Sequence, residues 1–257
     1  MNTDRIAHTI VVAGSIFGFL FLITPIVMVM LTSLTPERYP TLPYDGVTLE
    51  WYVETFTDRQ IVGSILTSFY VGTASGFLAT VVGTVAAFGF VRGDFPYKDE
   101  LSTIILLPMV ISPVIVGFAL IRYFNLANLP SGYPALIVGH TTLTLPFVFL
   151  LVRSQLLTFD RDLERASRML GADRTLTFMN VTLPLMAPGI IAGFFIAFII
   201  SFGEFTASQF LVEPGLRTIP IVIYNMLVTG LTPVVSAIAT ALVVMMLLLA
   251  AIAEYLS

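Results

Sequence analysis

The sequence lacks cysteine and carries little charge, and both absences exclude whole classes of protein. No cysteine means no disulfides and no thiolate chemistry, and the only two histidines, His8 and His140, lie too far apart in the chain to suggest a metal centre. The single lysine, Lys98, is followed by Asp99, whereas a Walker A loop needs Gly-Lys-Ser/Thr. No basic, aromatic-laced stretch suggests nucleic acid as a partner. We therefore expect no bound cofactor, no metal and no ATP hydrolysis by this chain.

What the chain has in abundance is apolar sequence. Apolar residues make up 57% of the chain and charged residues 11%, against roughly 25% charged in a soluble domain. Six apolar runs of about 18 residues or more are each long enough to cross a hydrocarbon core of ~30 Å. Backbone groups in lipid must be hydrogen-bonded within the segment, which predicts an all-α, multi-pass membrane protein with six transmembrane helices in one domain over residues 1–257. The runs are Ile10–Leu31, Ile61–Val91, Leu101–Ile121, Ala135–Val152, Pro188–Val212 and Val234–Ala253.

The distribution of lysine and arginine predicts the orientation. If the N-terminus is inside, eight of these residues lie in inside segments and four in outside segments. The positive-inside rule then places both termini and the segment between Arg153 and Arg174 in the cytoplasm, for a protein of the cytoplasmic (inner) membrane.

That segment belongs to a polar loop, residues 160–184, set between very apolar stretches. Asp160 can cap a short helix in which Leu163, Ala166, Met169 and Leu170 share one face, and Glu164 can pair with Arg168 at i, i+4. Gly171 stands where a left-handed cap would end that helix. A second helix is expected from Ala172 to Thr182, broken by Pro184. The periodicity alone is equally consistent with a solvated loop without a partner.

The same loop resembles the E-A-A-x3-G-x9-I-x-L-P signature of permease subunits of binding-protein-dependent ABC importers. Nine residues separate Gly171 from Val181, and Leu183-Pro184 complete the ending. The first triplet departs from the family, because Arg165-Ala166-Ser167 stands where Glu-Ala-Ala is usual. Any ion pair that the family's glutamate makes with its ATPase would therefore be altered in this chain. Glu164, one position earlier, is expected to replace part of the missing charge.

The resemblance extends over nearly the whole chain. Leu49–Gly72 resembles the entry to the second membrane helix of these permeases, and Ser201–Thr240 resembles the second permease of spermidine/putrescine importers. It implies a type I (MetI-like) permease fold and a 160–184 coupling loop against a dimer of ABC ATPase subunits, which bind ATP-Mg. It also implies a second permease subunit in a heterodimer, an extracytoplasmic substrate-binding protein and a small cationic substrate such as a polyamine. Permeases for iron(III), thiamine or phosphonate are related alternatives.

The resemblance assigns the coupling role to one set of residues in the loop. These ATPase-coupling residues are Leu163, Glu164, Arg165, Ala166, Ser167, Leu170, Gly171, Leu183 and Pro184.

Glu204 is the main candidate for the substrate path. Counted along a fifth helix starting at Pro188, it lies roughly 24 Å from the cytoplasmic end, where a carboxylate is costly unless it faces water or a partner. Ser201, Glu204 and Ser208 would share a helical face, with Gln209 at its border. Glu204 therefore has two interpretations. It is either a pore-lining site for a cation or, more plainly, a carboxylate capped by helix ends or hydroxyls near the interface.

Other polar or helix-breaking residues have simpler interpretations. His140, beside several threonines, is expected to be a satisfied packing residue rather than a ligand. A different-class alternative is an intramembrane enzyme using Glu204 and His140 as an acid/base pair, which requires the two within hydrogen-bond reach. Pro108 and Pro113 predict a kink in the third helix. Trp51 and Tyr52 are expected at the bilayer interface. They lie in an acidic outer strip, Pro36–Arg59, that is a secondary candidate for contact with the binding protein and contains Glu37, Asp45, Glu50, Glu54 and Asp58.

Overall fold

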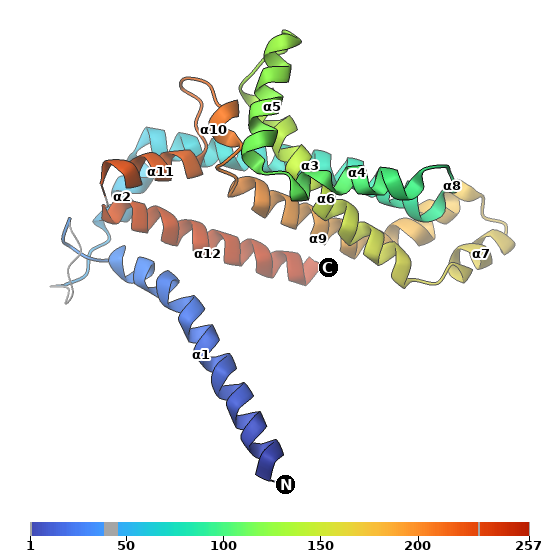
Figure 1. The fold of residues 1–257 in the computed structure, drawn as a ribbon, viewed down its shortest axis with the longest axis horizontal. Coiled ribbons are helices and arrows are strands. Elements are labelled where there is room, and N and C mark those ends of the chain that lie inside the picture. The colour runs from blue at the N-terminus through green and yellow to red at the C-terminus, as the bar shows by residue number, and fades with distance from the viewer. Residues whose placement is uncertain (1, 39–45, 231, 257) are drawn as a thin grey trace. The chain divides into compact units, whose positions relative to one another are not determined.

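The computed structural model of this chain describes residues 2–38, 46–230 and 232–256, so Asp45 of the acidic outer strip lies outside the described residues. Within these ranges every regular element is a helix (Figure 1). The longer helices are α1 (Asn2–Thr32), α3 (Arg59–Arg92), α4 (Lys98–Val110), α5 (Pro113–Leu126), α6 (Tyr133–Thr158), α9 (Leu183–Phe202), α11 (Ile219–Thr229) and α12 (Pro233–Leu256). The short elements are α2 (Glu50–Thr57), α7 (Asp162–Met169), α8 (Arg174–Thr177), the π-helical turn η1 (Phe178–Thr182) and α10 (Ser208–Leu211).

Each of the six predicted apolar runs overlaps one or more helices. Among the described residues, five helical stretches are long and apolar enough to cross a membrane, and the bent pair α4 and α5 makes up to six if it forms one span. The second stretch, α3, has 34 residues, which is more than a single perpendicular crossing needs. The fifth prediction was wrong in its limits, because the helical stretch runs over 174–202 and not to Val212.

The third span is sharply broken, as its prolines predict. The axes of α4 and α5 differ by 104° across a break at Ile111 and Ser112. Pro113 is at the start of α5, where its missing N–H costs no hydrogen bond, whereas Pro108 is tolerated inside α4. The break therefore lies just before Pro113 and not at Pro108.

By its internal contacts the chain forms two compact units, each described by itself. Unit 1 contains Met1–Val62 and Ile223–Met245, and unit 2 contains Gly63–Val222 and Met246–Ser257. In unit 1 the aromatic pair of α2 is bonded to the turn after α1: Trp51 Nε1 donates to the Thr35 carbonyl at 2.6 Å, and the Tyr52 hydroxyl lies 2.7 Å from Ser33 Oγ. These two side chains thus fix the segment before α3.

In unit 2 the core forms where α3, α6 and α9 pack, with α6 and α9 side by side (Figure 1). Glycines on α3 allow this approach, because small residues let membrane helices pack closely. A Cβ added to Gly72 would come within 3.1 Å of the Phe198 ring, and one added to Gly83 within 3.0 Å of Val148.

The polar loop enters α9 without a break. We expected Pro184 to end a helix, but α8, η1 and α9 form one helical stretch from Arg174 to Phe202. The N–H of Leu183 bonds to the carbonyl of Phe178, five residues earlier, and this π-helical turn lies directly before Pro184. The π-helical turn shifts the backbone hydrogen-bond pattern just before Pro184, so that Pro184 lies in the first turn of α9. In a first turn the N–H that proline lacks has no partner within the helix, and the helix is therefore not broken.

Candidate coupling loop and membrane polar cluster

The first helix of the loop, α7, ends at the glycine that the sequence predicts, but its N-cap is Arg161 and not Asp160. The Asp160 carboxylate, one position earlier, accepts the N–H of Asp162 at 2.9 Å. At its end Gly171 has φ +95°, its N–H bonds to the Arg168 carbonyl, and the N–H of Ala172 bonds to the Ser167 carbonyl. These two bonds are those of a Schellman cap, which requires a left-handed residue at the glycine. The predicted helix and glycine cap are confirmed.

The apolar side chains of α7 face outward. Met169 is 88% and Leu170 90% exposed, and Leu163 and Ala166 are also exposed. Burial of large apolar side chains is normally favourable by roughly 1.5–3 kcal/mol each. An ordered helix that leaves such a stripe uncovered presents a surface suited to another protein.

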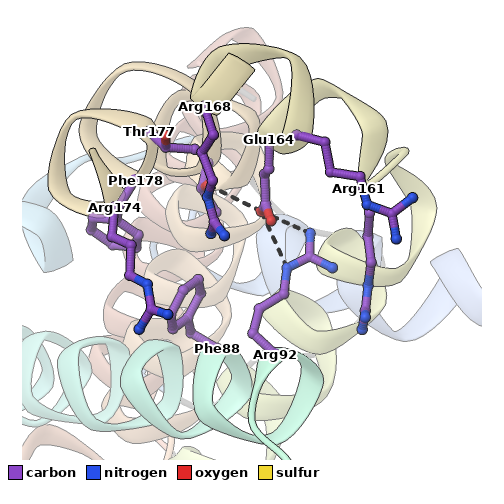
Figure 2. A pocket seen from close by; sticks show the side chains of 10 residues that line it. Phe88, Arg92, Arg161, Glu164, Arg168, Arg174, Thr177 and Phe178 are labelled. Atoms are coloured by element: carbon purple, nitrogen blue, oxygen red, sulfur yellow. Dashed lines mark hydrogen bonds and ion pairs between the residues drawn. The ribbon is translucent and has the colours of Figure 1, made fainter. Parts of the chain in front are cut away.

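The opposite face of α7 turns inward through Glu164. Its carboxylate lies 2.9 Å from Arg92 Nη2, accepts a hydrogen bond from Arg92 Nε at 3.2 Å, and accepts the Thr182 hydroxyl at 3.1 Å (Figure 2). The predicted pairing of Glu164 with Arg168 is therefore wrong. Both side chains of the observed pair are only 12% exposed, and an ion pair withdrawn from water is stronger than an exposed i, i+4 pair. The carboxylate thus connects α7 to the end of α3.

The other motif residues differ in how they lie. Arg165 is exposed and pairs with Asp162 at 2.7 Å, whereas Ser167 is half-buried, with its hydroxyl 3.4 Å from that of Thr177. Leu183 and Pro184 are exposed on the first turn of α9. The second half of the loop begins at Asp173, whose carboxylate accepts the N–H of Leu176 at 2.7 Å.

The structure corrects the predicted helical face around Glu204. Helix α9 ends at Phe202, and Glu204 lies in the turn before α10. Its carboxylate accepts the N–H of Ala207 at 2.7 Å, and its carbonyl accepts the Ser208 hydroxyl at 2.8 Å. A side chain that bonds to a nearby N–H favours a new turn over continuation of the helix. The plainer interpretation, a carboxylate at a helix end, describes this geometry, and Glu204 is half-buried.

The break nevertheless brings Ser201 and Ser208 to one buried residue. His140 of α6 lies with Nδ1 2.7 Å from Ser201 Oγ and Nε2 2.8 Å from Ser208 Oγ, and Ser201 Oγ is also 2.8 Å from Ser75 Oγ of α3. All four side chains are at most 3% exposed. Gln209, by contrast, is exposed. The histidine is a satisfied packing residue, as the sequence predicts.

Two features of this cluster escaped the sequence. Ser75 is a small residue in an apolar helix, and no spacing in the chain connects it to Ser201. The second feature is close backbone contact: a Cβ on Gly117 of α5 would lie 2.8 Å from the Ala207 carbonyl oxygen. A glycine after a proline break was a weak signal for such an approach.

Comparison with known proteins explains why this loop and this helical arrangement occur together. Residues 79–257 match the model of a family described as the binding-protein-dependent transport system inner membrane component. The chain belongs to this family. It is thus a permease of the ABC importer class, not an enzyme, and the acid/base alternative fails as well on geometry, because both ring nitrogens of His140 face serine hydroxyls.

Relatives and solved structures agree with this assignment. The permease is 26% identical over 239 residues to the spermidine/putrescine transport system permease protein PotC of Haemophilus influenzae, covering 93% of each chain. It is 29% identical over 232 residues to the putrescine transport system permease protein PotI of Escherichia coli K12, covering 88% of this chain and 82% of the relative. A bacterial ABC transporter for the import of alginate has the same fold, with a TM-score of 0.76, 16% identity and coverage of 99% and 98%. The expected MetI-like fold is confirmed, as shown also by the MetNI methionine transporter with a TM-score of 0.64.

Proposed function

We propose that this permease forms part of the translocation path of an importer for a small cationic solute, with a polyamine as the first choice. The observation that best supports coupling to an ATPase is the ordered α7 helix with its exposed apolar stripe. The stripe consists of Leu163, Ala166, Met169 and Leu170. A stripe of this kind fits a groove on a soluble partner, and the partner of the family's loop is an ABC ATPase dimer that binds ATP-Mg.

The loop is connected both to the ATPase side and to the membrane helices. Its apolar face meets the ATPase, its inner face is tied to α3 by the Glu164–Arg92 pair, and its second half continues directly into α9. A displacement of α7 would therefore reach two long apolar helices through an ion pair and a continuous helix. The exposed motif ending, Leu183 and Pro184, lies where that continuous helix leaves the loop.

The remaining partners follow from the class of transporter. We propose a heterodimer with a second, related permease, two ATPase subunits and one extracytoplasmic binding protein, in a cytoplasmic membrane with both termini of this chain inside. The arginine-rich 160–184 loop supports this orientation.

For the substrate path we propose Glu204 as the cation-facing residue, with Ser201, Ser208 and Gln209 around it. Glu204 is the only acidic residue between Asp173 and Glu213, and it follows directly after an apolar helix. Ser201 and Ser208 are buried under His140 in this arrangement, so their participation requires the turn at 203–207 to move.

Uptake by the complete importer tests the substrate. The complex of both permeases and the ATPase, reconstituted in proteoliposomes with its binding protein, should accumulate radiolabelled spermidine or putrescine when ATP is enclosed. Uptake of thiamine, phosphonate or iron(III) instead, with no polyamine uptake, would refute the choice of substrate and leave the coupling proposal standing.

A further inference from the structure

A pocket of about 250 Å³ lies on the inner face of the coupling loop (Figure 2). Its lining contains five arginines and a single acidic residue, Glu164, which Arg92 already neutralises. The five arginines come from the end of α3, from α7 and its preceding turn, and from the start of α8: Arg92, Arg161, Arg165, Arg168 and Arg174.

Several of these cations lack a counter-charge. Arg165 pairs with Asp162, and Arg161 Nη2 donates to the Val91 carbonyl at 2.8 Å. Within the described part of the chain, Arg168 and Arg174 have no ion-pair partner, and Figure 2 shows both extending toward the space beside Phe88. Arg92 is already engaged, because its Nη2 is buried 2.9 Å from the Glu164 carboxylate. Clustered guanidinium groups without a counter-charge are stabilised by an anion with several acceptor oxygens.

The position of the pocket indicates the source of that anion. Arg92 ends one apolar span, Arg59–Arg92, and Arg174 begins another, Arg174–Phe202. Arginines at the ends of membrane spans lie at the level of the lipid headgroups. The wall on the membrane side is formed by Phe88 and Phe178. Their rings pack edge to face, with the ring centroids 5.2 Å apart. A phosphate next to an apolar wall is the chemistry of a phospholipid.

The geometry of α7 separates this pocket from the ATPase contact. At 100° per residue, Glu164 and Arg168 are on one side of the helix, and Leu163, Ala166 and Leu170 are on the opposite side. An ATPase docked on the apolar stripe would therefore leave the arginine side to another ligand.

We propose that this pocket binds the phosphate of an anionic phospholipid, held by Arg168 and Arg174. The lipid would hold α7 against α3 and so fix the angle at which the coupling loop meets the ATPase. The inference rests on the proposed function only in placing the loop at the cytoplasmic membrane face, and it is independent of the transported solute.

The test measures lipid retention by the purified permease–ATPase complex. Native mass spectrometry after exchange into detergent with phosphatidylglycerol or phosphatidylcholine reports which lipid stays bound. Wild type should keep phosphatidylglycerol in preference. Since each basic side chain near a lipid surface changes affinity by about fivefold, the double variant Arg168→Gln with Arg174→Gln should weaken that retention about 25-fold. The matched control, Arg122→Gln with Arg217→Gln, changes two exposed arginines elsewhere and should retain the lipid.

Each result is decisive. Restored retention in the Arg168→Lys, Arg174→Lys variant would support a charge-based site, whereas equal phosphatidylglycerol retention by wild type and the glutamine variant would overturn the proposal. Displacement of bound lipid by millimolar inorganic phosphate would assign the pocket to a soluble anion and also overturn it. Loss of the ATPase with full lipid retention would instead make these arginines a protein contact. Failure of the ATPase to assemble with the wild-type chain would refute the proposed function, without affecting the lipid measurement on the permease alone.

Discussion

Replacing Gly171 should weaken coupling because of its backbone conformation and not because of its size. Its φ is +95°, and a Cβ placed there would have no atom within 4 Å. The cost of a side chain is therefore conformational, about 1–2 kcal/mol for alanine and more for β-branched valine. Because one or two kcal/mol changes a two-state ratio by about 5–30-fold, the loop would leave its capped form for much of the time. Asparagine, which tolerates this region, should cost least.

The assay is ATP hydrolysis stimulated by the substrate-loaded binding protein, in the reconstituted complex at matched abundance. We expect activity to fall in the order Asn, Ala, Val at position 171. Gly215 is a matched control: its φ is +89° and it too has open space around its Cβ position, so Gly215→Val adds a similar strain outside the loop and should leave stimulation largely intact. Full stimulation in Gly171→Val, or equal loss in the asparagine and valine variants, would refute the reasoning.

Three further substitutions test the other contacts. Glu204→Gln keeps an acceptor for the Ala207 N–H but removes the charge, so polyamine uptake should slow while ATPase assembly is unchanged; uptake at the wild-type rate would count against Glu204 as a path residue. His140→Ala removes one hydrogen bond from each of the Ser201 and Ser208 hydroxyls, at about 0.5–1.5 kcal/mol each, so the thermal unfolding temperature in detergent should drop, and an unchanged value would show that these two bonds contribute nothing. Glu164→Gln removes the counter-charge of Arg92, which should reduce stimulated ATP hydrolysis, whereas Asp162→Asn at the exposed pair should have little effect; equal effects would contradict a special role for the inward pair.

The sequence predicted the features that depend on local pattern. Long apolar runs gave the membrane helices, and glycine at position 171 after an amphipathic turn gave the cap, because both follow from hydrogen bonding within a few residues. Pro113 likewise marked the break before α5, where the absent donor is harmless.

The errors concern competition between local and distant partners. Glu164 had a suitable arginine four residues away, but Arg92, 72 positions earlier, comes closer when α3 packs beside the loop. Pro184 is a helix breaker in an α-helical register, yet a single π turn before it removes the conflict. Glu204 had helical spacing to two serines, but its carboxylate caps a new turn, and the serines meet at His140 from separate helices. No spacing in one sequence predicts such contacts.

The most direct test of the central claim, that the exposed face of α7 docks on the ATPase, is co-purification of the ATPase with Leu170→Asp. Leu170 is 90% exposed, so the substitution should leave the permease itself folded, while burying an unpaired carboxylate at the contact would cost several kcal/mol. Val47→Asp, at another exposed apolar residue with 77% exposure, is the control. We expect the control to retain the ATPase and Leu170→Asp to lose it. Wild-type amounts of ATPase on the Leu170→Asp permease, with wild-type transport, would show that the exposed face of α7 is not the docking surface.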